Sequence, residues 1–202
     1  TFHQKDIEEL AREADIPVIN ALTDQYHPCQ IFCDLLTIRE KFGVIEGLKI
    51  AYFGDGNNIA RSWINAAKLL DIDLWIATAA DTHPGEEFLA AALESAAGRV
   101  TITQDPDEAT HNADVLYTDV WASMGEKNAA AQRAASLNKF QINQTVLKNA
   151  QSKAIVMHCL PAERGKEITD EIMDGPNSVV FDQAENRLHG QKAILLWALG
   201  EV

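Results

Sequence analysis

The sequence lacks any long hydrophobic run. A helix that crosses a membrane needs about 20 consecutive apolar residues, whereas the longest candidate, Ala193–Leu199, is far shorter. No secretory signal opens the chain either, because Thr1 leads directly into a mostly polar stretch that is typical of a helix start. We therefore expect a cytoplasmic protein.

Positive charge is also scarce. The chain has 17 Lys and Arg residues against 30 Asp and Glu residues, which gives a formal net charge of −13 at pH 7. Nucleic acids and anionic membranes are bound by basic faces. The composition therefore argues against both as partners.

Cysteine is rare, and its three positions do not have the spacing of a metal site. We expect no metal. Cys29 and Cys33 lie four residues apart, on one face of a helix, and are expected to be buried, reduced thiols of a cytoplasmic protein. Cys159 has different surroundings and is treated below.

What the sequence does contain, from residue 46 onward, is an alternation of short apolar runs and amphipathic stretches. This pattern is typical of a doubly wound parallel α/β sheet. The expected strands are Leu48–Phe53, Ile72–Ala77, Val100–Thr103, Val115–Asp119, Ala154–His158 and Ser178–Asp182. Helices are expected between these strands. The first ends near Leu70, the second runs from Pro84 to about Ala97, the third is a helical turn near Asp107–Ala113, and the fourth is an Ala-rich region after Asp119.

The first 45 residues are expected to form a separate piece. It would contain a helix at Lys5–Ala14, a short strand at Pro17–Asn20 and a long helix at Pro28–Phe42. The last stretch, Lys192–Gly200, is expected to be an amphipathic helix that either closes the domain or reaches across to a neighbour. The expected division is therefore residues 1–45, a sheet domain over 46–186, and a C-terminal helix within 187–202 that packs back toward the first part.

Unusual polar residues follow four of the expected strands. They belong to Gly54–Asn58, the segment from Asp119 to Gly125, His158–Pro161 and Asp182–Arg187. Ligands of an open parallel sheet bind at the carboxyl ends of its strands, near a switch in strand order. The gathering of carboxylate, hydroxyl, amide, thiol and guanidinium groups at one edge predicts a small-molecule site.

Each of these residues also has a structural interpretation. The glycines after Phe53 lack the third glycine of a dinucleotide-binding turn, and a tight strand-to-helix turn explains them equally well. Asn58 or Asp119 could cap a helix. Arg187 could form a surface ion pair, and His27 could simply precede Pro28 at a helix entry.

Cys159 is harder to explain structurally, because it lies at the end of a strand between His158 and a Leu-Pro turn. A nearby arginine would favour its thiolate, which can accept a proton. A protease-like Cys/His pair is disfavoured, because neighbouring residues on a strand point to opposite faces.

Together, four motifs resemble the ornithine carbamoyltransferase family in order and spacing, and the similarity extends over essentially the whole chain. They are His27-Pro-Cys-Gln30, Asp119 with Ser123-Met-Gly125, His158-Cys-Leu-Pro161 and Glu185-Asn-Arg187. The resemblance implies transfer of a carbamoyl group from carbamoyl phosphate to the δ-amine of ornithine, giving citrulline and phosphate, without a metal or organic cofactor.

The resemblance also assigns residues. His27, Gln30, Cys159, Leu160 and Arg187 would bind carbamoyl phosphate, with His27, Cys159 and Arg187 catalytic. The set that would hold ornithine is Leu22, Asn58, Asp119, Ser123 and Met124. Residues 1–45 would end a carbamoyl-phosphate domain, residues 46–186 would form the ornithine domain, and a homo-oligomer, usually a trimer, is implied.

The family's Ser-Thr-Arg-Thr-Arg phosphate loop does not occur in these 202 residues. Roughly the first third of the family's length is therefore expected to be absent, which would explain the acidic balance. We expect the 202 residues alone to bind carbamoyl phosphate weakly. Two alternatives remain open: a carbamoyltransferase for another amine such as putrescine, and a catalytically incomplete fragment that acts as a binding domain.

Overall fold

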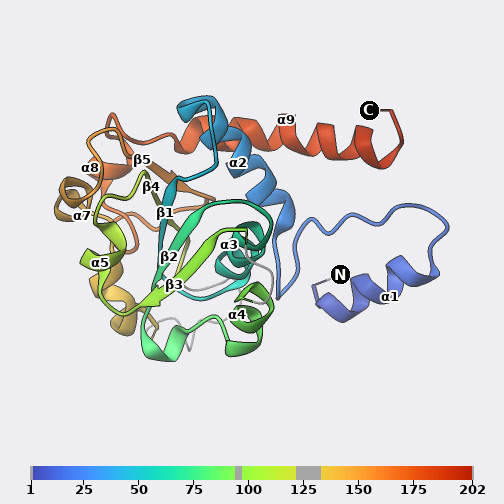
Figure 1. The fold of residues 1–202 in the computed structure, drawn as a ribbon, viewed down its shortest axis with the longest axis horizontal. Helices are drawn as coiled ribbons and strands as arrows, with labels where there is room; N and C mark the ends of the chain where they lie inside the picture. The colour runs from blue at the N-terminus through green and yellow to red at the C-terminus, as the bar shows by residue number, and fades with distance from the viewer. Residues whose placement is uncertain (1, 94–96, 122–132, 202) are drawn as a thin grey trace.

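The computed structural model describes residues 2–93, 97–121 and 133–201. In it, five strands form one parallel sheet in the order β3-β2-β1-β4-β5 (Figure 1). The strands are β1 (Lys49–Phe53), β2 (Asp73–Ala77), β3 (Arg99–Thr103), β4 (Val115–Thr118) and β5 (Ile155–His158). The doubly wound parallel sheet is confirmed, and each of these strands lies at its expected place in the sequence.

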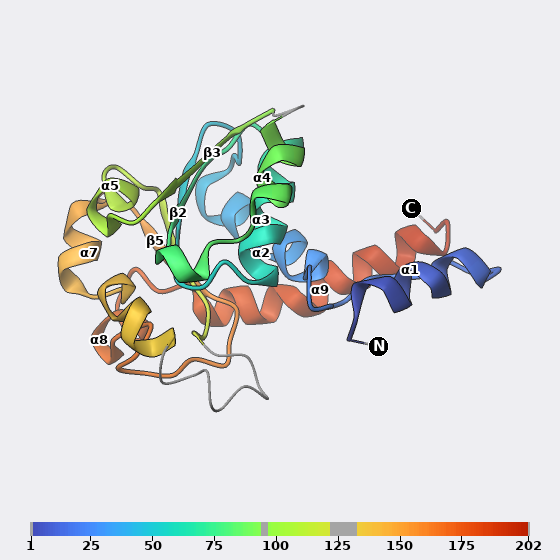
Figure 2. The same cartoon turned by 90° about the horizontal axis from the view of Figure 1, so that it is seen from below.

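Helices cover both faces of the sheet, as Figure 2 shows. One face carries α2 (Pro28–Phe42), α3 (Asn58–Leu69), α4 (Glu86–Leu93) and α9 (Val180–Ala198). The other carries α5 (Pro106–Thr110), α7 (Gln144–Asn149) and α8 (Asp170–Met173). Short 3₁₀ turns occur at Ala80–Thr82 and Asn138–Phe140. None of the helices in the described ranges is long and apolar enough to cross a membrane.

Alternate strand residues supply two separate cores, which is the result expected of a sheet covered on both faces. Tyr52 and Tyr117 point to the face of α2 and α3, and their rings stack there with Trp63 packed edge-on against Tyr117. Phe53 and Leu116 point to the opposite face, toward α5, α7 and α8. Both cores end at the carboxyl edge of the strands, where the candidate site lies.

The sixth expected strand is wrong. Ser178 makes an isolated parallel bridge with Val156, and the backbone N–H of Val179 donates to the Val156 carbonyl at 3.0 Å. The chain then enters α9 at Val180. Asp182–Arg187 therefore form the first turns of a long helix instead of a loop after a strand.

The N-terminal segment differs from expectation in one element. Helix α1 (Gln4–Glu13) and helix α2 agree with the prediction, whereas no strand is assigned at Pro17–Asn20. Helix α1 buries none of its side chains and lies apart from the sheet in both views (Figures 1 and 2). Most of the Ala-rich region expected after Asp119 lies at 122–132, outside the described residues.

Helices α2 and α9 pack closely against each other. A Cβ atom added at Gly190 would lie 2.5 Å from the Cys33 sulfur, so only glycine allows this approach. Cys29 and Cys33 are buried free thiols, as expected. Buried Asn186 of α9 donates to Thr37 at 3.0 Å and to Glu40 at 2.7 Å. These contacts hold α9 against α2.

Candidate functional site

The strand order reverses between β1 and β4. From β1 the chain builds outward through β2 to β3, then returns to the other side of β1 for β4 and β5. The loops that follow β1 and β4 therefore diverge and leave a crevice at the carboxyl edge. Asn57 and Asn58 follow β1, Asp119 follows β4, and Cys159 follows β5. The topology thus brings three of the predicted loops to one place.

Asp119 is the centre of this crevice. Its side chain is buried, and Oδ1 accepts hydrogen bonds from the Cys159 thiol at 2.9 Å and from the Val120 backbone N–H at 2.8 Å. Oδ2 accepts from Nδ2 of Asn57 at 2.8 Å. Asp119 therefore acts as a fixed acceptor, and none of these three hydrogen bonds caps a described helix.

The helix cap at this site is Asn57, not Asn58. Oδ1 of Asn57 accepts from the backbone N–H groups of Ile59 and Ala60, at 2.9 and 3.3 Å. The same amide holds Asp119 through its nitrogen, so one residue caps α3 and orients the carboxylate. Asn57 was missed by the sequence analysis, although adjacent asparagines before a helix are a signal that either one is the cap.

Asn58 is instead turned toward the N-terminal segment. Its Nδ2 donates to the backbone carbonyl of Thr23 at 2.9 Å. Leu22 directly precedes Thr23 in the chain, and its side chain is exposed. Ser123 and Met124, the other predicted ornithine contacts, lie outside the described residues.

Gly56 has a structural role in the turn after β1. A Cβ atom at this position would lie 2.3 Å from the backbone nitrogen of Pro84 and 2.5 Å from the carbonyl oxygen of Thr82. Its own N–H donates to that carbonyl at 2.8 Å. A close backbone approach therefore requires glycine here, in line with the structural interpretation of this turn.

The surroundings of Cys159 favour its thiol form. Burial, then the negative charge of Asp119 and its hydrogen bond, raise the pKa of Cys159 well above its ordinary value. The expectation that an arginine would favour the thiolate is therefore wrong: the charged group in contact with the sulfur is a carboxylate. The anion of the crevice is Asp119, and Cys159 is its hydrogen-bond donor.

The neighbouring His158 faces the other way, as the strand alternation predicts. Its Nε2 lies 3.2 Å from Oε1 of buried Glu167, and its Nδ1 accepts from the Leu160 backbone N–H at 2.9 Å. Leu160 has a left-handed φ of 58° and precedes a cis proline. The His158–Glu167 pair thus fixes the turn that carries Cys159 and Leu160.

His27 directly precedes α2, and the charges of Arg187 and Asp119 both act on its imidazole. Burial and then the positive charge of Arg187 lower its pKa to about 4, while a backbone hydrogen bond to Ala21 and the charge of Asp119 act in the opposite direction. The imidazole is therefore neutral at pH 7. Its Nδ1 is buried and has no partner among the residues that the structure describes.

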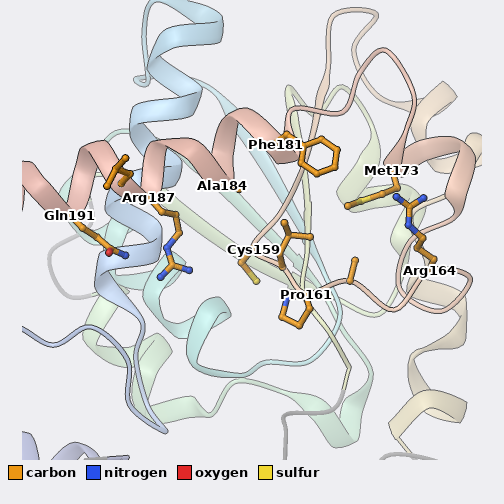
Figure 3. A pocket seen from close by; sticks show the side chains of 11 residues that line it. Cys159, Pro161, Arg164, Met173, Phe181, Ala184, Arg187 and Gln191 are labelled. Atoms are coloured by element: carbon orange, nitrogen blue, oxygen red, sulfur yellow. The ribbon is translucent and has the colours of Figure 1, made fainter.

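Arg187 enters the same region from α9. Its guanidinium extends from the helix toward the space beside Cys159 (Figure 3). No ion pair of Arg187 is found in the described part of the chain, and Gln191, with its amide turned to suit both groups, accepts from Nε and Nη2 at 3.1 and 3.0 Å. The surface ion pair is therefore not observed. Cys159, Leu160 and Arg187 line one cavity of about 710 Å³.

Gln30 does not line this cavity, and neither do the predicted residues His27, Leu22, Asn58 and Asp119. Gln30 is fully buried one turn after His27, and its Nε2 donates to Asp34 at 2.8 Å. No group of three or more His, Cys, Asp or Glu side chains suited to a metal is found within the described ranges. The arrangement can hold an amine at Asp119 and an anion at Arg187, with a neutral imidazole donor nearby.

Family models match both parts of the chain. The carbamoyl-phosphate-binding domain of aspartate/ornithine carbamoyltransferases matches residues 1–40, and their Asp/Orn-binding domain matches residues 46–198. The chain belongs to the aspartate/ornithine carbamoyltransferase family.

Relatives within this family are 50% or more identical to the chain over the matched residues. An ornithine carbamoyltransferase of Methanoculleus marisnigri is 50% identical over 190 residues, which cover 94% of this chain and 61% of that protein. One of Syntrophus aciditrophicus is 55% identical over 195 residues, covering 96% and 65%. The chain thus spans less than two thirds of the length of these two relatives.

Solved structures agree. The ornithine carbamoyltransferase of Gloeobacter violaceus superposes with a TM-score of 0.90 at 49% identity, over 98% of this chain and 67% of that one. The Pyrococcus furiosus enzyme gives 0.93 at 47% identity, over 100% and 65%. The carbamoyltransferase fold of the described residues is therefore shared with these enzymes.

Proposed function

We propose that the protein containing these residues transfers the carbamoyl group of carbamoyl phosphate to the δ-amine of L-ornithine, giving L-citrulline and phosphate. The observation that carries the proposal is the Cys159–Asp119 pair, held by Asn57 at the switch point of the sheet. Family membership and the ornithine carbamoyltransferases among its relatives favour ornithine over putrescine and over a binding module.

The amine half of the site follows from charge. The δ-amine is a cation in water and must lose a proton before its lone pair can attack. Asp119 supplies the fixed negative charge that attracts it, and the Cys159 thiol on the same carboxylate places a sulfur beside the incoming nitrogen. We assign Asn58, Ser123 and the backbone of Met124, together with Asp119, to the α-amino and α-carboxylate groups of ornithine. The backbone at Leu22 is assigned to the δ-amine end.

The carbamoyl half requires donors. Attack by the neutral nitrogen forms a C–N bond and a tetrahedral intermediate with a negative oxygen. Its collapse breaks the bond to the phosphate oxygen, which leaves with the electron pair, and the leaving phosphate can take the proton that the attacking nitrogen loses. Neutral His27 can donate to the negative oxygen of the intermediate from the tautomer that carries its proton on Nδ1, the ring nitrogen without a partner among the described residues. Arg187 can stabilise the charge of that oxygen or of the phosphate. Gln30 and the backbone at Cys159 and Leu160 complete this half.

We further infer the division of the chain and its setting. Residues 1–45 would end a carbamoyl-phosphate domain, 46–186 would form the ornithine domain, and 187–202 would pack back on the first part, an arrangement that the packing of α9 on α2 supports. A homotrimer, a role in arginine metabolism and a cytoplasmic location are implied by the family resemblance. Light-scattering mass of the purified protein tests the trimer.

The test of the function is turnover by the full-length protein with carbamoyl phosphate and either ornithine or putrescine. We expect citrulline from ornithine and little product from putrescine. Equal or better turnover of putrescine would show that the amine was assigned wrongly. No product from either amine, in a folded protein, would support the binding module.

A further inference from the structure

Asp34 is a carboxylate with no exposed surface, on the buried side of α2. It accepts three hydrogen bonds from three different elements. Gln30 of α2 and Gln183 of α9 donate to Oδ1 at 2.8 and 2.7 Å, and the Tyr117 hydroxyl of β4 donates to Oδ2 at 2.8 Å. An ionised carboxylate accepts and cannot donate. It therefore determines which end of each amide faces it.

The hydrogen bond to Asp34 leaves the side-chain oxygen of Gln30 free to accept. Its Nε2 is committed to Asp34, while its buried Oε1 has no partner among the described residues. A buried carbonyl oxygen without a partner is costly unless a donor arrives. The opposite amide orientation would set oxygen against the carboxylate. Asp34 thus leaves Gln30, one turn after His27, ready to accept from an N–H group.

The hydrogen bond between Gln183 and Asp34 also affects the end of β5. Its Nε2 faces Asp34, so its Oε1 is turned to accept the backbone N–H of His158 at 2.8 Å. His158 ends β5 and immediately precedes Cys159 and Leu160. The same carboxylate that orients Gln30 therefore also fixes the backbone from which the Cys159–Leu160 turn departs.

We propose that Asp34 is a positioning residue for carbamoyl phosphate: it directs the Gln30 oxygen toward the carbamoyl NH₂ group and, through Gln183, holds the Cys159–Leu160 turn in place. This role rests on the proposed function. Asp34 acts through other residues and touches no reacting atom. It joins the helix that carries His27 and Gln30 to the strand that carries Cys159.

The charge around Asp34 makes this role dependent on pH. Tyr117 faces it from β4, Arg187 acts on it from α9, Cys33 adjoins it on α2, and Cys159 follows β5. Burial raises the pKa of Asp34 to about 6, against the hydrogen bonds of its three donors and the charge of Arg187. Below that pH the group carries a proton and can donate, so it no longer fixes the Gln30 amide. Affinity for carbamoyl phosphate should fall there.

The first test is Asp34→Asn in the full-length protein. Asparagine has the same shape as aspartate, but its NH₂ group would face one of the three groups that donate to Asp34. We expect KM for carbamoyl phosphate to rise about ten-fold, the effect of roughly one lost hydrogen bond, while KM for ornithine changes less than about two-fold. Calorimetric titration with carbamoyl phosphate should show the same loss of affinity.

The matched control is Thr37→Val, one turn further along α2. It removes the hydroxyl that accepts from Asn186, and so weakens the same α2–α9 interface without touching Gln30. We expect unchanged KM values. An equal rise of KM for carbamoyl phosphate in this control, or an unchanged KM in Asp34→Asn, would overturn the proposal. Wild-type protein that makes no citrulline would instead reject the proposed function itself.

The second test, which remains informative if Asp34→Asn does not fold, is Tyr117→Phe. Its hydroxyl lowers the pKa of Asp34, so its removal should raise that pKa. The acidic limb of the pH profile of kcat/KM for carbamoyl phosphate should then move to higher pH. A limb that stays where it is in the wild type would contradict the proposal, because loss of packing alone does not shift a titration.

Discussion

The Cys159 thiol donates a hydrogen bond to Oδ1 of Asp119 across 2.9 Å, joining the carboxyl ends of β5 and β4. In this pair the Asp119 carboxylate, and not the Cys159 sulfur, carries the negative charge. The sulfur is a neutral donor whose ionisation that carboxylate opposes. The site is thus organised around Asp119, with Cys159 and Asn57 as the two groups that hold it.

Replacing Asp119 by Asn should remove the charge that attracts the δ-ammonium group. We expect kcat/KM for ornithine to fall by roughly 10²-fold or more, the range for loss of a group that handles a proton. Steady-state citrulline formation measures it. Glu171→Gln, an exposed carboxylate on α8, is the control and should behave as wild type. Equal activity of the Asp119 variant would remove that residue from the mechanism.

The raised pKa of Cys159 predicts slow alkylation. Iodoacetamide reacts with thiolates, so labelling of Cys159 should be much slower at pH 7 than that of a free thiol and should accelerate at high pH. Asp119→Asn lowers the barrier to ionisation and should speed labelling at a given pH. Peptide mass mapping follows each cysteine separately. Rapid labelling at pH 7 would show that the thiolate dominates after all.

The lowered pKa of His27 predicts a loss of stability in acid. The folded state binds this proton only near pH 4, whereas the unfolded state binds it near 6.5. Between these values the unfolded state holds more protons, so the free energy of unfolding falls as pH decreases from about 6.5 to 4. Above pH 6.5 the contribution is fully present.

Asp34 titrates with the opposite sign, because its folded pKa is raised from 3.8 to about 6. The quantity to measure is therefore the difference between wild type and His27→Gln. Urea unfolding at pH 7.5 and pH 5 should show a smaller decrease for the variant than for the wild type. Parallel decreases would mean that His27 keeps an ordinary pKa in the folded protein.

Gly56→Ala should destabilise the fold through backbone contacts. The new methyl group would meet Pro84 and Thr82 at distances that no Cβ tolerates, and such overpacking costs about 1–3 kcal/mol or more. Gly165→Ala is the comparison, since it has open space and only a φ of 83° to oppose it. Chemical denaturation should rank Gly56→Ala as the more damaging. The reverse order would contradict the geometry of the turn.

The buried strands and helix α2 could be predicted because their residues are apolar with a clear period. The start of α9, where a sixth strand was expected, could not be predicted. Val179, Val180 and Phe181 read as a strand, yet Phe181 is exposed, and the buried positions of α9 recur every three to four residues. Two of those positions are Gln183 and Asn186, whose polarity conceals the helical period.

Site residues that directly follow a strand could be predicted from the sequence. The roles of two adjacent residues that could each cap the same helix could not. Asn57 and Asn58 are chemically identical, and only the backbone at the start of α3 decides which one caps it and holds Asp119. The charge state of Cys159 depends on a partner 40 residues away. Asp34 gains its role from Gln183, 149 residues along the chain, which no local pattern shows.

The most direct test of the central claim is the bond that forms. Full-length protein would be supplied with carbamoyl phosphate labelled with ¹³C at the carbonyl and ornithine labelled with ¹⁵N, and the product would be observed by NMR. We predict a one-bond ¹³C–¹⁵N coupling when the δ-nitrogen is labelled and none when the α-nitrogen is labelled. Coupling to the α-nitrogen, or transfer of no label to ornithine, would contradict the account.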